Sequence, residues 1–367
     1  FVMPEKGGEV RQVTTHQPGI EEMAIPDDEN LYFTAFEKGT PRLYHVNIHD
    51  LDKVEKVSAT KKLYIEWIEP GPKKSLAVHY SEGEERYRVA VMDSLQKMRR
   101  IIEDAVVFSG FEMDSQQHYA AYIETYENWS RTLYLYDFQA KKKNKLTDYD
   151  GYMANIFWAN NEECLIFQQN DKIMRLDLTG QEDFEETEDP WDEILNPPVA
   201  ETEDEDSEKA EETVSAGPVL DDVQARLHVL VEKPGWNTPV AVAEDSLLYF
   251  INYFENEITL FCVNYQGENE ERVLSLGSGT DDFNCAYNAE QNALYYIQNK
   301  SIKKLSTKSQ KAETVENRFD YEYDELALNR SVFEWAWREF GHYFYDADMH
   351  GIDWDAAYKR YIPYLQY

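Results

Sequence analysis

The sequence repeats itself with a period of about 44 residues over most of its 367-residue length. Each copy contains an apolar segment typical of a buried strand, with one strand-like segment before it and two after it. The apolar segments are separated by 44, 44, 45, 83 and 46 residues, with centres at Phe33, Ala77, Ala121, Ile166, Tyr249 and Tyr295. Four-stranded units that recur in this way are typical of a β-propeller, in which each blade buries both faces against its neighbours. We therefore predict an all-β propeller of antiparallel blades, since a two-sheet sandwich does not explain a period sustained through six copies.

The one long gap contains an acidic insertion at residues 179–225. Between residues 181 and 212 there are 16 Asp and Glu residues against one Lys, and prolines occur at 190, 197, 198 and 218. Such a segment buries too little apolar surface to offset the entropy lost on ordering, so we expect a disordered loop. Residues 227–231 (Leu-His-Val-Leu-Val) are then the delayed outer strand of the fourth unit.

Residues 1–15 contain half a unit, because only two outer-strand segments can be recognised there. Either this half completes a blade with strands from the far end of the chain, or it belongs to a truncated neighbour. Six complete units and one half predict six or seven blades, within a propeller domain at residues 1–328.

The pattern changes in the last part of the chain, at residues 329–367. Phe333, Trp337, Phe340 and Phe344 recur at the spacing of one helical face. A second short helix is predicted at residues 353–361, with Asp353 as its N-cap and Pro363 after its end. A short α-helical segment therefore follows the propeller.

Composition narrows the classes of partner. The net charge of −35 argues against nucleic acid, which needs clustered Lys and Arg. No apolar stretch approaches the roughly 20 residues of a membrane-spanning helix, so we expect no membrane span. Cys164, Cys262 and Cys285 are widely spaced in apolar segments, which favours buried free thiols over a disulfide or a zinc site. The start at Phe1, without an initiator Met or a leader, indicates a piece of a longer protein.

Two parts of the chain resemble known families. Residues 25–33 (Ile-Pro-Asp-Asp-Glu-Asn-Leu-Tyr-Phe) resemble the WSPDGKxIAF repeat of TolB-like propellers, residues 157–167 are a degenerate copy, and residues 7–14 resemble their GGxxRQLT outer edge. The C-terminal segment is more specific. Residues 334–338 (Glu-Trp-Ala-Trp-Arg) and 343–354 (Tyr-Phe-Tyr-Asp-Ala-Asp-Met-His-Gly-Ile-Asp-Trp) resemble the start of the first catalytic subdomain of tricorn-like serine proteases, a family of the tail-specific peptidase clan.

The resemblance covers the second TolB-like propeller and the truncated beginning of that catalytic subdomain. It implies a parent serine peptidase with two propellers, a PDZ domain and a Ser nucleophile activated by a His base. The His lies in a Ser-His-Thr-Tyr-like motif that this sequence lacks. We therefore assign no catalytic, cofactor-binding or metal residue and no cofactor to this chain, and expect it to be inactive by itself. The implied partners are peptides or unfolded polypeptide and the downstream PDZ and catalytic domains, and a homo-oligomer is allowed.

Three groups of residues have a functional and a structural interpretation. Asp346, Asp348, His350 and Asp353 are clustered enough for a metal site, although the resemblance favours a turn between helices. Residues 122–129 could line a peptide-binding funnel, although ordinary blade packing is favoured. Trp335 and Trp337 are expected in an interdomain core.

Two other functions stay open. The first is a TolB-type or WD-type interaction scaffold with no attached peptidase. The second is a hydrolase acting within the propeller funnel, which requires three or more carboxylates converging on the axis.

Overall fold

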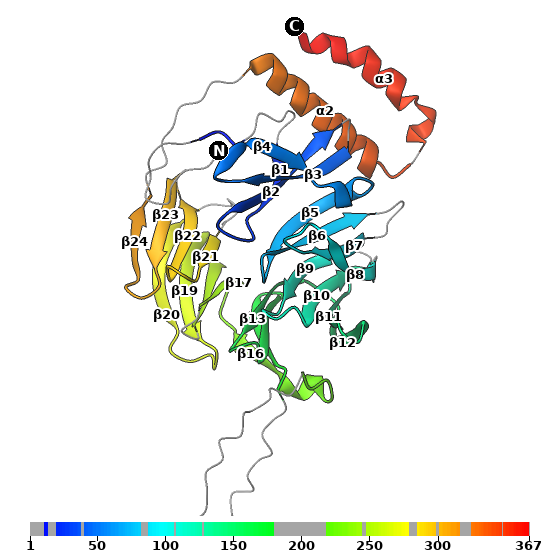
Figure 1. Cartoon of the computed structure of the whole chain (residues 1–367). Coiled ribbons are helices and arrows are strands. Elements are labelled where there is room, and N and C mark those ends of the chain that lie inside the picture. The colour runs from blue at the N-terminus through cyan, green and yellow to red at the C-terminus, as the bar shows by residue number, and fades with distance from the viewer. Residues whose placement is uncertain are drawn as a thin grey trace, which may run out of the picture.

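The computed structural model describes residues 11–13, 20–37, 40–81, 87–105, 108–126, 128–179, 218–243, 247–278, 285–298, 301–315, 324–346 and 348–366. Within these ranges lie six four-stranded antiparallel sheets, which follow one another around a ring in chain order (Figure 1). The predicted propeller of four-stranded blades is confirmed, and the described residues form six blades.

Each blade is a simple up-and-down meander of consecutive strands. Blades 1 to 3 comprise β1 (Ile20–Ala24), β2 (Asn30–Glu37), β3 (Thr40–Asn47) and β4 (Asp50–Lys56); β5 (Tyr64–Gly71), β6 (Ser75–Ser81), β7 (Tyr87–Met92) and β8 (Met98–Ala105); and β9 (Phe108–Met113), β10 (Tyr119–Thr125), β11 (Arg131–Asp137) and β12 (Lys142–Tyr149). Blades 4 to 6 comprise β13 (Met153–Ala159), β14 (Cys164–Gln169), β15 (Lys172–Asp177) and β16 (Leu227–Val231); β17 (Trp236–Ala243), β18 (Leu247–Phe254), β19 (Glu257–Asn264) and β20 (Glu271–Gly277); and β21 (Cys285–Asn288), β22 (Ala293–Gln298), β23 (Ser301–Ser306) and β24 (Lys311–Thr314).

The six apolar segments that define the repeat are the second strands of the six blades. Every residue of β6 is buried, and so are the central residues of β2, β10 and β14. This continuous burial replaces the usual alternation because neighbouring blades cover both faces of a blade. β16 pairs antiparallel with β15, so residues 227–231 form the delayed fourth strand, as predicted.

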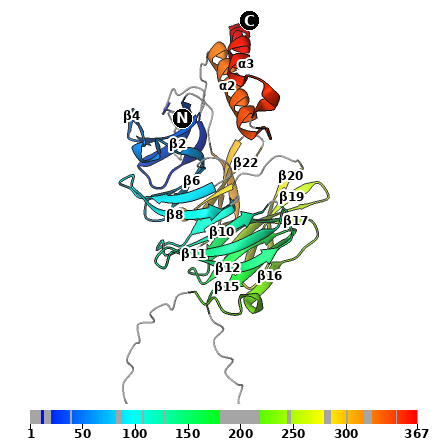
Figure 2. The same ribbon diagram turned by 90° about the vertical axis from the view of Figure 1, so that its right-hand side faces the viewer.

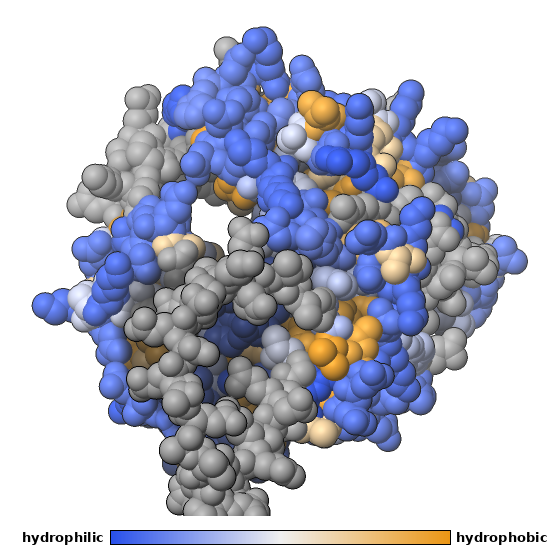
Figure 3. Space-filling view, turned by 60° about the horizontal axis from the view of Figure 1, so that its bottom comes forward, coloured by the Kyte–Doolittle hydropathy of each residue, from blue (hydrophilic) through white to orange (hydrophobic). Residues whose placement is uncertain are grey.

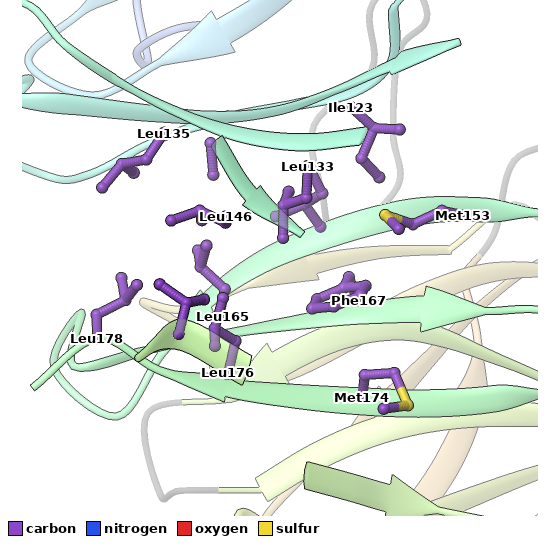
Figure 4. Close-up of a cluster of buried hydrophobic side chains, with 13 residues drawn as sticks. Ile123, Leu133, Leu135, Leu146, Met153, Leu165, Phe167, Met174, Leu176 and Leu178 are labelled. Atoms are coloured by element: carbon purple, nitrogen blue, oxygen red, sulfur yellow. The ribbon is translucent and has the colours of Figure 1, made fainter. Parts of the chain in front are cut away.

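The core is divided into apolar clusters that lie between successive blades. One of them joins blades 3 and 4, where Leu133 and Leu135 of β11 face Leu165 and Phe167 of β14 (Figure 4). All four side chains are fully buried. Equivalent clusters join blades 1 and 2, 2 and 3, 4 and 5, and 5 and 6. Blade packing thus supplies the apolar burial that a single four-stranded sheet lacks.

Turn chemistry fixes the connections between strands. Asp27 accepts backbone hydrogen bonds from Glu29 (2.9 Å) and Asn30 (2.8 Å), which closes the turn between β1 and β2. Glu255 and Asn256 both have positive φ, +49° and +66°, and form the two-residue loop between β18 and β19. Such loops match the twist of an antiparallel pair, and Asn tolerates the left-handed conformation.

Two helices follow the propeller and lie beside each other outside the ring (Figure 2). α2 (Glu325–Tyr343) begins at Asp324, whose carboxylate accepts from two backbone amides. α3 (Trp354–Tyr361) begins at the predicted N-cap Asp353, which accepts from Ala356 N at 2.8 Å. The predicted aromatic face of α2 packs on α3, and Trp337 stacks on Trp354 at 4.0 Å between ring centroids. Among the helices of the described ranges, none is both long and apolar enough to cross a membrane.

Two sequence predictions fall partly outside the described residues. Of the half unit at residues 1–15, only 11–13 are described, where Val13 is buried against blade 1. Of the insertion at 179–225, residues 180–217 are outside the description. Its end is ordered, contrary to expectation, because Val223 in the short 3-10 helix η2 (Val223–Arg226) joins the core between blades 3 and 4.

Candidate binding site in the propeller channel

The first strand of each blade lies at the inner edge of its sheet. First strands of neighbouring blades contact one another between β1 and β5, β9 and β13, β13 and β17, and β17 and β21. They therefore form the wall around the axis of the ring, as the innermost strands of propellers do. The space-filling view looks through an opening in the ring, and the coloured part of its border in that view is mostly hydrophilic (Figure 3).

A cavity of about 340 Å³ lies between the inner strands of blades 2, 3 and 4. Its lining residues come from the end of β5 and the following proline, from β9 and from β13: Glu69, Pro70, Gly71, Pro72, Ser109, Gly110, Phe111, Glu112, Met113, Asn155, Ile156 and Phe157. We call this cavity the acidic pocket, because Glu69 and Glu112 are the only ionisable side chains among the described residues that line it.

Local irregularities of the strands shape the acidic pocket. β13 is irregular between Ala154 and Phe157, and Asn155 has a positive φ of +54°. Bulges of this kind bend a strand and redirect its side chains. Gly71 permits blades 2 and 3 to approach, because a Cβ there would lie 2.5 Å from Met113 Cε and from Ser75 Oγ.

The environment of the pocket favours the neutral form of both carboxyl groups. Burial, opposed in part by the hydrogen bond from Trp67, raises the pKa of Glu69 to about 7. Burial and the charge of Glu69 raise the pKa of Glu112 to about 8. About 35% of the Glu69 side chain is still solvent-accessible, because it faces the cavity. The charge of Glu22, on β1, adds to the upward shift in the pKa of Glu69.

His79 of β6 lies directly behind Glu69. Its side chain is only 1% exposed, and its Nε2 is 3.6 Å from Glu69 Oε1. Neither ring nitrogen has a hydrogen-bond partner among the residues that the structure describes. Burial depresses the pKa of His79 well below its usual value, so the ring is neutral. Trp67 stacks on it with centroids 4.1 Å apart and donates a hydrogen bond of 2.8 Å to Glu69 Oε1.

A second feature is the contact between the helical segment and blade 1. Arg338 of α2 forms an ion pair with Glu21 of β1 at 2.9 Å, and its guanidinium lies over the ring of Phe36 of β2. The Arg338 side chain is only 9% exposed. Beside it, Ile20, Glu21 and Phe36 line a hollow with Trp335 and other α2 residues. The helix is therefore docked on the propeller through a partly buried charge pair and an aromatic contact.

The residues singled out in the sequence lie elsewhere. Asp346 accepts from the backbone of Asp348 and His350 and pairs with the His350 ring at 2.9 Å, which forms a turn between α2 and α3. Asp353 caps α3. Across the described residues, no group of three or more His, Cys, Asp and Glu side chains is arranged to hold a metal ion.

Some of the aromatic residues singled out in the sequence are packed in the interior, and others are exposed at the surface. Tyr122 is fully buried inside blade 3, whereas Trp129 is 75% exposed on a turn, so they form no common funnel lining. Trp337 packs within the helical segment, and Trp335 borders the hollow on blade 1 with 46% exposure.

Sequence reasoning missed Glu69, Glu112 and His79. The available signal was an acidic residue near the end of an apolar first strand in two successive repeats. Among the described residues, Glu69 and Glu112 line the acidic pocket, and the charge of Glu22 on β1 also acts on Glu69. The interpretation as a hydrolase acting in the funnel stays a hypothesis. That this chain carries no catalytic residue stays a prediction.

Fold and docked helices together define a six-bladed propeller with a helical extension on its first blade. Residues 327–367 match the family model of the tricorn protease C1 domain. The chain also resembles the crystal structure of tricorn protease, with a TM-score of 0.66 and 13% identity over 95% of this chain and 35% of that one. The chain thus combines a propeller with the fold seen in tricorn protease and a segment of the C1 type, and spans about a third of the tricorn protease chain.

Other solved structures share the fold alone. The uncharacterised protein lmo1340 from Listeria monocytogenes EGD-e has a TM-score of 0.54 and 10% identity, covering 86% of this chain and 88% of its own. An oligogalacturonate lyase in complex with manganese has a TM-score of 0.54 and 8% identity, covering 82% and 77%. Comparison with curated protein sequences gives no match.

Proposed function

We propose that this chain is a non-catalytic propeller module of a tricorn-like serine peptidase, and that it guides unfolded polypeptide towards an active site carried downstream of it. The observation that carries the proposal is the match of residues 327–367 to the tricorn protease C1 domain. The matched segment includes most of α2, the helix docked on blade 1 through Arg338 and Glu21. A docked helix of this kind would hold the propeller in a fixed position relative to a catalytic region.

The physical basis for guidance is steric selection. A channel bordered by six inner strands is narrow, so it would admit an extended chain and exclude a folded protein. Polar groups such as Glu69 and Glu112 on the wall would keep the channel hydrated and give a passing peptide hydrogen-bond partners.

The test compares an unfolded and a folded form of one protein. We expect the purified chain to bind reduced, carboxymethylated α-lactalbumin in fluorescence anisotropy, not to bind native α-lactalbumin, and to cleave neither. Extending the gene beyond Tyr367 should reveal a PDZ segment and a Ser nucleophile. Proteolysis by this chain alone that a serine-directed inhibitor blocks, or equal binding of both forms, would contradict the proposal.

A further inference from the structure

We propose that the acidic pocket binds the side-chain cation of a lysine or arginine in a polypeptide that occupies the channel. This inference rests on the proposed function, because it names the kind of residue that the channel recognises. The site is formed by Glu69 and Glu112, with the unpartnered ring of His79 behind Glu69.

The first step concerns the missing positive partner. Elsewhere in the ring a buried carboxylate has its own cation, since Lys143 Nζ lies 2.6 and 2.7 Å from the two oxygens of Glu124. Within the described ranges no Lys or Arg forms an ion pair with Glu69 or Glu112, and none lines the pocket. Two carboxyl groups in one cavity are costly to ionise without a counter-charge, so an external cation is the natural complement.

The second step concerns the orientation of Glu69. Trp67 donates a hydrogen bond to Oε1, and His79 Nε2 lies 3.6 Å from the same atom. Among the described residues nothing donates a hydrogen bond to Oε2. The carboxylate is therefore held at one oxygen and presents the other as an acceptor for an incoming N–H group.

The third step concerns the shape of the wall. Pro70, Met113, Ile156 and Phe157 give the pocket an apolar lining around the two carboxyl groups. Lys and Arg have apolar stems and a charged end, so they gain from a cavity that offers both kinds of surface. The polar side chain of Asn155 is already engaged, since it donates to Gln168 Oε1 at 2.9 Å. A small inorganic cation would leave most of the 340 Å³ cavity unfilled.

Titration of the pocket supports this assignment. The raised pKa of Glu69 (about 7) and of Glu112 (about 8) means that an empty pocket retains protons near neutrality. A bound cation favours the ionised carboxylates, so binding should strengthen as the pH rises from about 6 to about 9. Besides Glu112, the ionisable groups near Glu69 in the described part of the chain are Glu22 from β1 and His79 from β6, of which His79 stays neutral.

The test uses probes that carry one side chain and no polypeptide. N-acetyl-arginine amide and N-acetyl-citrulline amide have almost the same shape, but only the arginine compound is cationic. By calorimetry near pH 8.5, we expect the arginine compound to bind at least about tenfold more tightly, since charged hydrogen bonds to carboxylates are the strong ones. The Glu69→Gln/Glu112→Gln double variant should lose this preference, whereas the control Glu232→Gln, at an exposed ion pair with Lys172, should keep it.

Three results would overturn the inference: equal binding of the two compounds, a preference that survives in the double variant, or displacement of the arginine compound by submillimolar Mg²⁺. A melting curve checks that the double variant is folded. The two proposals fail separately. Loss of selective binding to carboxymethylated α-lactalbumin with the arginine preference intact contradicts only the proposed function, and the reverse pattern contradicts only the pocket.

Discussion

At the scale of single residues, the acidic pocket places two carboxyl groups where their charge is unfavourable. Glu112 has a pKa raised to about 8, chiefly by burial and next by the charge of Glu69. In the unfolded chain its pKa returns to the usual value near 4.5. The folded state thus holds a proton that the unfolded state releases between these two values, so folding stability falls as the pH rises through this window.

Replacement of Glu112 with Gln should therefore stabilise the protein in alkaline solution. The gain in the free energy of unfolding should be small near pH 4.5, grow as the pH rises, and level off above about pH 8 at about 1–3 kcal/mol. Urea unfolding at pH about 5, 7 and 9 measures it. The free energy of unfolding of Glu232→Gln, at an exposed site, should change with pH in the same way as that of the wild type. The same pH dependence in Glu112→Gln would contradict a raised pKa of Glu112.

At the scale of strands and helices, the sequence predicts where the elements lie better than it predicts which of their side chains meet in space. All six apolar segments were placed correctly as second strands, because burial on both faces leaves a continuous apolar signal. The approach of Glu69 and Glu112 was not predicted. It depends on an irregular pairing of β5 between Ile65 and Trp67, on the bend at Asn155 and on the packing of blade against blade. None of these leaves a residue pattern in a single strand.

Arg338 of α2 contributes to the docking of the helix, because it pairs with Glu21 and lies over the ring of Phe36. Arg338→Met keeps most of the volume but removes the cation that pairs with Glu21, whose pKa is already raised mainly by burial, and leaves it only the hydrogen bond from Trp335 among the described side chains. We expect the helix contact to weaken by about 1–3 kcal/mol, seen as faster hydrogen exchange of the α2 amides with blades 2 to 5 unchanged.

The matched control for Arg338 is Arg330→Met. Arg330 lies on the same helix, is 64% exposed and pairs with Glu334 at 2.8 Å. An exposed pair of this kind contributes about 0.5 kcal/mol or less, so α2 exchange should stay close to the wild-type rate. Equal effects of the two substitutions would show that Arg338 is not a docking residue.

At the scale of the whole molecule, hydrogen bonds join the two segments that flank the acidic insertion, residues 177–179 and 219–226. The Arg226 guanidinium, 5% exposed, donates hydrogen bonds to the carbonyl oxygens of Asp177 (2.6 Å), Thr179 (3.3 Å), Val219 (2.8 Å) and Asp221 (2.6 Å). Val219 N also donates to Leu178 O at 2.8 Å. The strands before and after the insertion are thus joined within the blade, and the blade does not depend on residues 180–217 for that connection.

Deletion of residues 180–217, with a short Gly-Ser bridge from Thr179 to Pro218, should therefore leave the melting temperature within about 2 °C of the wild type. The deletion also removes a net charge of −15 from a total of −35, which should favour the compact state slightly at low salt.

Arg226→Ala is the contrasting variant. It removes the hydrogen bonds that a buried guanidinium donates to several partly buried carbonyl oxygens, so it should lower the free energy of unfolding by about 2–4 kcal/mol in calorimetry. If the deletion destabilised the protein as much as Arg226→Ala does, the acidic segment would be a structural part of blade 4.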